Sequence, residues 1–281
     1  MLDLRLRNRW IVTPEFLYRF IPSSQIVIVD CRFSLADPAL GQQLYTESHI
    51  PDAHYLDLNQ DLSSPVQPHG GRHPLPNIEK LANKLSAMGV RSGTTPEAEA
   101  TWVVAYDDSR FAFAARLWWL LRYLGHDRVA ILDGGLQGWQ TAGYPVTAAS
   151  PVSQMGAFVP RVRSAWVVDI ADLKARQNQL TLVDSREAER YRGEHEPIDP
   201  VAGHIPGAMN YPWQEVTDLQ GFVLSESAQQ ERWVNLPREQ EVVVYCGSGV
   251  TACVNLLSLE MAGINSAKLY PGSWSDWCSY L

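Results

Sequence analysis

The chain has 281 residues, of which 46% are hydrophobic, 10% aromatic and 19% charged, a composition typical of a globular protein with enough apolar material for two domains. Its 23 Lys and Arg residues against 31 Asp and Glu residues give a formal net charge of −8, which argues against nucleic acid as a partner. No apolar run approaches the ~20 residues of a membrane span, and charged residues interrupt the apolar ones at the N-terminus, so we expect a soluble, cytoplasmic protein without a membrane partner.

Two segments of the first half recur, in the same order, in the second half. QIVIVDCRF and HIPDAHYLDLN recur as TLVDSRE and HIPGAMNYPW, and the segment that begins with TWVVAYDDSRFAF recurs as EVVVYCGSGVTAC. The offset falls from 155 residues between His49 and His204 to 139 between Tyr106 and Tyr245, so the first copy holds about 16 extra residues between these points. We expect them in loops rich in Gly, Pro and Ser, at residues 63–76 and 91–100.

Both copies have the same order of predicted elements: a strand, a loop, a second strand, an apolar helix and a third strand. Short apolar runs such as IVIVD, WVVAY and VVVYC, alternating with helices, are typical of parallel strands that are buried on both faces. We therefore predict an α/β fold of two tandem domains, each a mainly parallel sheet flanked by helices. The domains are expected at residues 1–145 and 164–281, because residues 146–163 lack helical periodicity and are typical of a linker.

The cysteines are too few and too irregularly spaced for a disulfide scaffold; they are Cys31, Cys246, Cys253 and Cys278. No C-x-x-C pair indicates a zinc site or a redox dithiol, so we expect no metal and no other cofactor. A functional cysteine in this chain would act singly, as a thiolate.

The segment VVVYCGSGVTACVNLL predicts a strand, a tight turn and a helix that begins near Ala252. Cys246 then lies at the carboxyl end of a buried strand, where open α/β sheets bind their ligands. The turn residues after it are Gly247, Ser248, Gly249, Val250 and Thr251. Inward-pointing N–H groups and the positive end of the helix dipole would stabilise an anion there, such as a thiolate. The first copy has Asp107 at the corresponding position, so only the second copy is expected to be catalytic.

The repeated layout, the paired HIP segments and above all CGSGVT at residues 246–251 resemble the tandem-domain rhodanese family of sulfurtransferases, over nearly the whole chain. Ser248, the third residue of the loop, resembles the 3-mercaptopyruvate branch, whereas the thiosulfate branch typically has CRKGVT. The resemblance implies two rhodanese-like domains, the first an inactive copy. It also implies that Cys246 becomes a persulfide by taking sulfur from 3-mercaptopyruvate, a small anionic donor that the loop residues 247–251 bind. The acceptor would be cyanide or a thiol, for example that of a thioredoxin-like protein, and we expect a monomer.

An anionic donor needs a cation that the loop lacks. Matching the family's DSR-x-x-x-R-Y to DSREAERY implies that Arg190 binds the donor and that Arg186 is structural. The mercaptopyruvate branch has a second arginine about nine positions after the first, where this chain has Asp199. Weaker candidates for binding the donor's carboxylate are Arg72, His69 and His73 in PHGGRHPLP, each also interpretable as loop surface. Arg186 is a further weak candidate, as is Asn59, which stands where the family has an acidic residue near the domain interface.

Other functions remain open. A thiosulfate sulfurtransferase would use the same persulfide, and a non-catalytic sulfur carrier or regulatory module would share the fold without a donor pocket. A cysteine phosphatase would need C-x-x-x-x-x-R to grip phosphate, but the sixth residue after Cys246 is Ala252, which argues against that activity.

Overall fold

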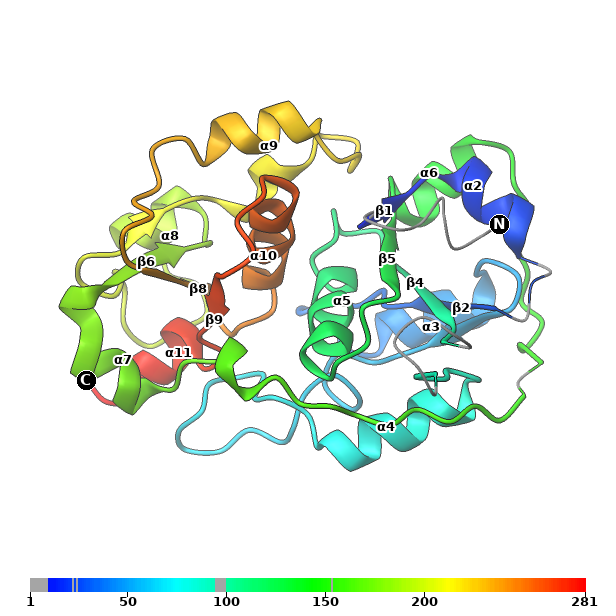
Figure 1. The fold of residues 1–281 in the computed structure, drawn as a ribbon, viewed down its shortest axis with the longest axis horizontal. Helices are drawn as coiled ribbons and strands as arrows, with labels where there is room; N and C mark the ends of the chain where they lie inside the picture. The colour runs from blue at the N-terminus through cyan, green and yellow to red at the C-terminus, as the bar shows by residue number, and fades with distance from the viewer. Residues whose placement is uncertain (1–9, 22, 24, 94–99, 153) are drawn as a thin grey trace. The chain divides into compact units, whose positions relative to one another are not determined.

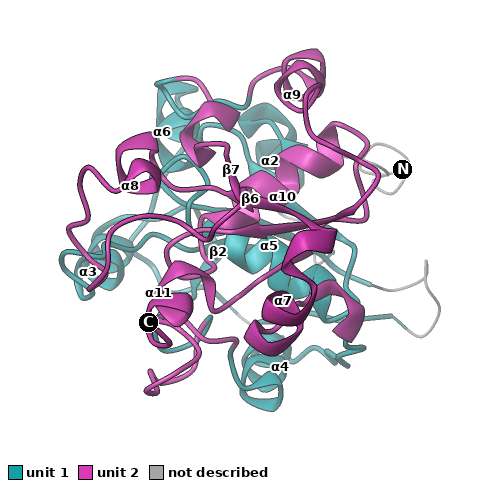
Figure 2. Cartoon of the chain, turned by 90° about the vertical axis from the view of Figure 1, so that its left-hand side faces the viewer, with its two compact units in different colours: residues 1–62, 76–162, 219–223 teal, residues 63–75, 163–218, 224–281 magenta. Residues whose placement is uncertain are grey.

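The computed structural model describes residues 10–21, 23, 25–93, 100–152 and 154–281 (Figure 1); part of the loop expected at residues 91–100 lies outside them. The chain forms two compact units, coloured separately in Figure 2. Unit 1 comprises Met1–Leu62, Pro76–Val162 and Leu219–Val223, and unit 2 comprises Ser63–Leu75, Arg163–Asp218 and Leu224–Leu281. A loop of the first repeat, residues 63–75, therefore belongs to unit 2, and a short piece of the second repeat belongs to unit 1.

Unit 1 contains a five-stranded parallel sheet with the strand order β1-β5-β4-β2-β3. Its strands are β1 (Ile11–Val12), β2 (Ile26–Asp30), β3 (Ala53–Tyr55), β4 (Trp102–Tyr106) and β5 (Val129–Leu132). The helices are α2 (Pro14–Phe20), α3 (Leu40–Glu47), α4 (Ile78–Ala87), α5 (Ala114–Tyr123) and α6 (Gly135–Thr141). The interior strands β2 and β4 are buried along nearly their whole length, as their continuous apolar sequences predict.

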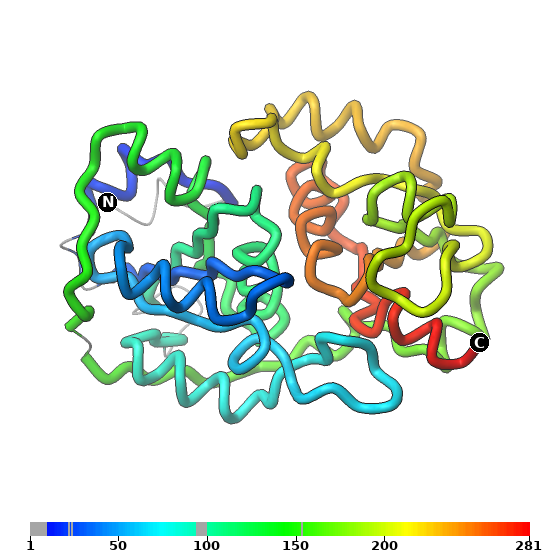
Figure 3. The backbone as a smooth tube through the Cα atoms, turned by 180° about the vertical axis from the view of Figure 1, so that it is seen from behind, coloured from blue at the N-terminus to red at the C-terminus, as the bar shows by residue number. Residues whose placement is uncertain are grey.

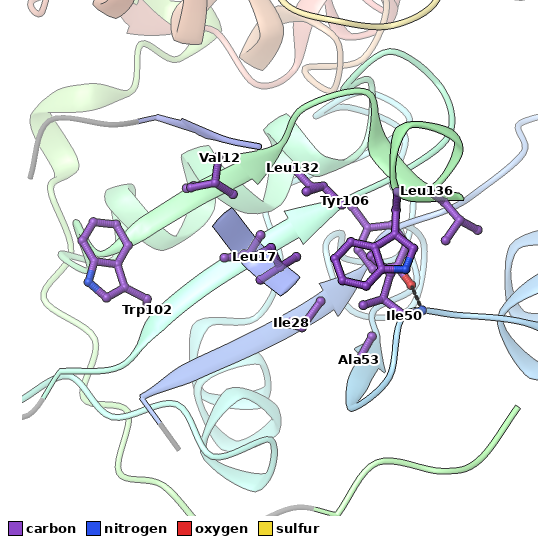
Figure 4. Packing of buried hydrophobic residues seen from close by; sticks show 12 residues of the cluster. Val12, Leu17, Ile28, Ile50, Ala53, Trp102, Tyr106, Leu132 and Leu136 are labelled. Atoms are coloured by element: carbon purple, nitrogen blue, oxygen red, sulfur yellow. Dashed lines mark hydrogen bonds between the residues drawn. The ribbon is translucent and has the colours of Figure 1, made fainter. Parts of the chain in front are cut away.

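The core of unit 1 gathers apolar side chains from β1, β2, β4, β5 and the neighbouring helices (Figure 4). Val12, Leu17 and Ile28 are almost fully buried there, and each such side chain stabilises the fold by about 1.5–3 kcal/mol through its removal from water. The phenol of Tyr106 lies in the same core, where it accepts the N–H of Ile50 at 3.3 Å and so keeps a polar group satisfied.

Unit 2 contains a four-stranded parallel sheet with the order β7-β6-β8-β9. The strands are β6 (Leu180–Asp184), β7 (Met209–Asn210), β8 (Glu241–Tyr245) and β9 (Lys268–Leu269). The helices are α7 (Ile170–Arg176), α8 (Ala188–Arg192), α9 (Glu226–Arg232), α10 (Ala252–Met261) and α11 (Ser273–Cys278), with 3-10 turns at Ser164–Trp166, Gln177–Gln179 and Trp213–Val216. The predicted fold class, two α/β domains with parallel sheets and flanking helices, is confirmed.

Each sheet has a buried ion pair at the end of one interior strand, and the two pairs are at equivalent positions. Asp30, which ends β2, binds Arg32 at 2.7 Å, and Asp184, which ends β6, binds Arg186 at 2.7 Å. All four side chains are almost completely buried, and each carboxylate neutralises the guanidinium that would otherwise be an uncompensated charge in the core.

The two HIP segments also match in three dimensions. The His49 ring stacks on Tyr45 and its Nδ1 lies 2.6 Å from the Tyr45 carbonyl oxygen. The His204 ring stacks on Tyr191, with its Nδ1 2.7 Å from that residue's carbonyl oxygen. Because both copies make the same local contacts, these histidines have a structural role.

Most of the predicted linker, up to Val162, belongs to unit 1. Thr147 forms an antiparallel bridge with His49, and Ala157 forms a parallel bridge with Arg91. Among the residues that the structure describes, no helix is both long and apolar enough to span a bilayer.

Candidate active site

Cys246 directly follows β8, at the carboxyl edge of the sheet of unit 2. The neighbouring strand β6 ends at Asp184 and is followed by α8, which contains Arg190. Because β7 lies on the far side of β6 and β9 on the far side of β8, the chain leaves these two central strands in opposite directions. Open α/β sheets bind their ligands at such a switch point, outside the carboxyl ends of the strands.

The turn after Cys246 surrounds its sulfur with backbone. The Gly249 N–H donates to Cys246 Sγ at 3.2 Å, and the side chain is only 1% exposed. Gly249 has a φ of +76°, and a Cβ there would lie 2.3 Å from the Pro271 carbonyl oxygen, so glycine is required. The predicted helix does begin at Ala252, and α10 (orange in Figure 3) directs its positive end towards the turn.

The backbone of Cys246 is held by the segment that begins α11. Its N–H donates to Ser273 Oγ at 3.1 Å, and its carbonyl oxygen accepts the N–H of Trp274 at 3.0 Å. Ser273 has a φ of +56°, which is strained for a residue with a Cβ, and its hydroxyl also donates to the Tyr270 carbonyl oxygen at 3.0 Å. Sequence reasoning missed Ser273. The signal for it is that PGSW, which contains Ser273, corresponds to DGG in the first repeat.

In unit 1 the side chain of Asp107 occupies the position that corresponds to Cys246 in unit 2. Asp107 follows β4 and is 1% exposed, and its two oxygens accept four backbone N–H groups, from Ser109, Phe111, Phe113 and Ala114, at 2.8–3.1 Å. Burial raises the pKa of Asp107, and these hydrogen bonds offset part of that rise because they favour the anion. The equivalent turn of the repeat therefore forms a cradle for an anion.

Arginines and acidic residues form a connected cluster beside the Cys246 turn. Arg190 binds Glu196 at 2.7 Å and Asp199 at 3.1 Å, and Arg186 binds both Asp184 and Glu196. Burial would raise the pKa of Glu196, but its hydrogen bonds with Arg190 and with backbone N–H groups lower it overall. Arg186 is almost completely buried, and the two terminal nitrogens of Arg190 lie 3.5 and 3.6 Å from the position of a Cβ on Gly247.

The loop at residues 63–75 brings two of the weaker candidates to the same turn. His73 Nδ1 lies 2.7 Å from Ser248 Oγ, and both residues are buried, so His73 is not loop surface. Arg72 forms an ion pair with Asp199, and one of its terminal nitrogens would be 3.0 Å from a Cβ on Gly247.

This loop is fixed to α11 by its backbone. The Gly70 N–H donates to Asp276 Oδ1 at 2.7 Å, and the Arg72 N–H donates to Ser275 Oγ at 3.1 Å. A Cβ on Gly71 would lie 2.4 Å from the carbonyl oxygen of Gly272, so the close approach of the two backbones depends on glycine.

The remaining candidates lie as follows. Val250 is buried and Thr251 is the half-buried N-cap residue of α10. His69 is stacked on Tyr280 near the end of the chain. Asn59 belongs to unit 1, where it is exposed and its N–H donates to Asp57 Oδ1 at 2.8 Å.

A family model for the rhodanese-like domain matches residues 13–142 and again residues 169–280, which are the two repeats. The chain belongs to the rhodanese family. This rhodanese-family chain is 44% identical over 274 residues to the probable 3-mercaptopyruvate sulfurtransferase of Pseudomonas aeruginosa, with 95% of the chain and 94% of the relative covered. It is 36% identical over 282 residues to a Mycobacterium tuberculosis protein named "putative thiosulfate sulfurtransferase", with 98% and 96% covered.

The fold of this rhodanese-family chain matches the structure of 3-mercaptopyruvate sulfurtransferase from Leishmania major with a TM-score of 0.83 and 28% identity, over 97% of this chain and 75% of that one. The relatives of both names are sulfurtransferases, and the chain is an enzyme of this class. The resemblance predicted from CGSGVT is confirmed.

Proposed function

We propose that the protein is a 3-mercaptopyruvate sulfurtransferase in which Cys246 carries the transferred sulfur and unit 1 is an inactive copy. The observation that supports this most directly is the Cys246 turn, where a buried sulfur accepts the Gly249 N–H at 3.2 Å. The guanidinium groups of Arg72 and Arg190 lie beside the same turn. An enclosed thiolate next to two cations suits attack on a small anionic donor.

The transfer proceeds in two steps. The Cys246 thiolate attacks the sulfur of 3-mercaptopyruvate, so that an S–S bond forms while the C–S bond breaks and its electron pair stays on carbon. The carbon then takes the proton that the donor's thiol released, which gives pyruvate and a Cys246 persulfide. In the second step cyanide or a thiolate attacks the outer sulfur, and the bonding pair returns to Cys246 as the thiolate.

Ser248 is the group of this turn best suited to move that proton. Its hydroxyl lies 2.7 Å from His73 Nδ1, and both side chains are buried from water. A hydroxyl that is paired with an imidazole can pass a proton between the donor and the ring, because one ring nitrogen can accept while the other releases.

The choice of donor rests on the turn and the relatives. Residues 246–251 include no Lys or Arg, and the 44% identical relative is named for 3-mercaptopyruvate. Thiosulfate is the second candidate donor, since the 36% identical relative is named for it and Asp199 stands where a second arginine is expected for mercaptopyruvate.

The acceptor that we propose is cyanide or a small thiol, including the thiol of a thioredoxin-like protein, and we propose that the protein acts as a monomer in the cytoplasm. All four cysteines are free, which suits a reducing compartment. Sedimentation of the purified protein tests the monomer.

Mass spectrometry tests the persulfide. The protein incubated with 3-mercaptopyruvate should gain the mass of one sulfur on the peptide that contains Cys246, and Cys246→Ser should gain none. Cys253→Ser is the matched control, because it removes a buried thiol seven residues away and should still load one sulfur. A wild-type protein that gains no sulfur from either donor would instead support a non-catalytic module.

Steady-state kinetics test the donor. We expect kcat/KM for 3-mercaptopyruvate to exceed that for thiosulfate, and Ser248→Lys to move the ratio towards thiosulfate by adding a cation to the turn. A preference of the wild type for thiosulfate would reject 3-mercaptopyruvate as the main donor and leave the persulfide mechanism intact.

A further inference from the structure

Asp199 lies between two arginines that come from distant parts of the chain. Its Oδ1 pairs with Arg72, in the loop at residues 63–75, and its Oδ2 lies 3.1 Å from Arg190 in α8. The Asp199 side chain is only 2% exposed. Both carboxylate oxygens thus face guanidinium groups, and its negative charge is already neutralised within the protein.

The two guanidinium groups meet over Gly247, the residue next to Cys246. A Cβ placed on Gly247 would lie 3.0 Å from a terminal nitrogen of Arg72, and 3.5 and 3.6 Å from the two terminal nitrogens of Arg190. The absence of a side chain at Gly247 therefore leaves room for the Arg72 guanidinium, while the Arg190 guanidinium lies at an ordinary contact distance from the same point.

Two guanidinium groups so close together repel each other unless an anion lies between them. Arg190 has a second strong partner in Glu196 at 2.7 Å, which would hold it in place without Asp199. The Arg72 side chain is 28% exposed, and its ion pair with Asp199 directs it towards Gly247. Removal of the Asp199 charge should therefore disturb Arg72 more than Arg190.

The backbone of Arg72 is fixed independently of Asp199. Its N–H donates to Ser275 Oγ at 3.1 Å, while the N–H of Ser275 donates to the Gly247 carbonyl oxygen at 2.9 Å. The loop and the turn are therefore joined through one residue of α11. Changing Asp199 should reorient a side chain without releasing the loop.

We propose that Asp199 is a positioning residue of the donor site, which holds the guanidinium groups of Arg72 and Arg190 together over Gly247 as a clamp for the donor's carboxylate. This inference rests on the proposed function, because it names how the same site takes a donor that bears a carboxylate. Arg72 supplies the second cation that the sequence lacks at position 199, and the acidic residue at that position holds it there.

A purely electrostatic role and a positioning role of Asp199 predict opposite effects of Asp199→Asn on donor binding. If Asp199 acted only as a negative charge near an anionic donor, its removal would strengthen donor binding. If it positions Arg72, its removal weakens binding, because an amide offers one acceptor oxygen where the carboxylate offers two. We expect KM for 3-mercaptopyruvate to rise about ten-fold, with kcat within about two-fold of wild type.

A double-mutant cycle tests whether Asp199 acts through Arg72. Steady-state kinetics with cyanide as acceptor would compare wild type, D199N, R72A and the double variant, together with product inhibition by pyruvate. We expect D199N to raise KM and the pyruvate inhibition constant in parallel, and to add little in the R72A background. D199E should restore part of the affinity, since it retains two acceptor oxygens.

Glu187→Gln is the matched control. It makes the same change of charge beside Arg190, whose Nη1 lies 3.9 Å from Glu187 Oε2, but Glu187 is 46% exposed and should leave KM within about two-fold of wild type. Should D199N fail to fold, R72K makes the same test from the other side, because an ammonium cannot bind Asp199 and lie against Gly247 at once.

The outcomes separate this inference from the function on which it rests. An unchanged or lowered KM in D199N, or an equal effect of D199N with and without Arg72, overturns the role of Asp199 while the wild type still loads sulfur on Cys246. If the wild type gains no sulfur from 3-mercaptopyruvate, the proposed function and this inference both fail.

Discussion

Replacing Asp107 by asparagine should destabilise unit 1, because the carboxylate satisfies four buried backbone N–H groups. Each oxygen accepts two of them: Oδ1 those of Ser109 and Phe111, and Oδ2 those of Phe113 and Ala114. Asparagine keeps one acceptor oxygen and turns an NH₂ group towards the other pair. Two N–H donors would then face another donor in a site closed to water.

The expected loss follows from these two donors. A buried donor without an acceptor costs about 1–3 kcal/mol, so two cost about 2–6 kcal/mol. Burial raises the pKa of Asp107, which means that the ionised side chain is itself penalised, and its removal returns part of the loss. We therefore expect a net destabilisation of about 3 kcal/mol, which for a unit of this size lowers the melting temperature by roughly 6–12 °C.

Thermal unfolding followed by circular dichroism measures the effect, with Asp108→Asn as the control. Asp108 is exposed, and its replacement makes the same change of charge one residue away. Sulfur loading of Cys246 at 25 °C should be unchanged in both variants, because Asp107 belongs to unit 1. If D107N and D108N melted at the same temperature, the anion cradle inferred for this turn would be refuted.

Three further changes probe the sites individually. Gly249→Ala should lower both the melting temperature and sulfur loading, since its Cβ would lie 2.3 Å from the Pro271 carbonyl oxygen, whereas Gly263→Ala, at a φ of +83° with nothing within 4 Å, should affect stability alone. Ser273→Gly should melt higher than Ser273→Ala by the equivalent of about 1 kcal/mol, because both lose the hydroxyl and only alanine is strained at a φ of +56°. Burial lowers the pKa of His126 from 6.5 to about 4. Between these two pH values the unfolded chain binds a proton at His126 that the folded protein does not. The free energy of unfolding should therefore fall by up to about 3 kcal/mol as the pH drops from about 6.5 to about 4. Urea titrations at several pH values should show this slope, and His126→Gln should lack it.

The sequence by itself determined the parts of this protein that depend on local pattern. Apolar runs such as WVVAY and VVVYC predicted the buried central strands, because a parallel strand covered on both faces needs apolar residues throughout. The spacing of Gly247 and Gly249 after Cys246 predicted a tight turn and the start of α10 at Ala252. The sequence repeat predicted two α/β units, and in the structure each unit has its own sheet.

Only the tertiary structure decided which distant residues share the site. Arg72 and His73 belong to a loop of the first repeat that packs in unit 2, and no local pattern indicates that, because the packing of backbone against α11 fixes the loop. The same holds for Asp199. From the sequence it was only an acidic residue at a position where an arginine was expected. In the structure it forms ion pairs with Arg72 and Arg190, because the effect of a charged side chain depends on the groups that face it in the fold.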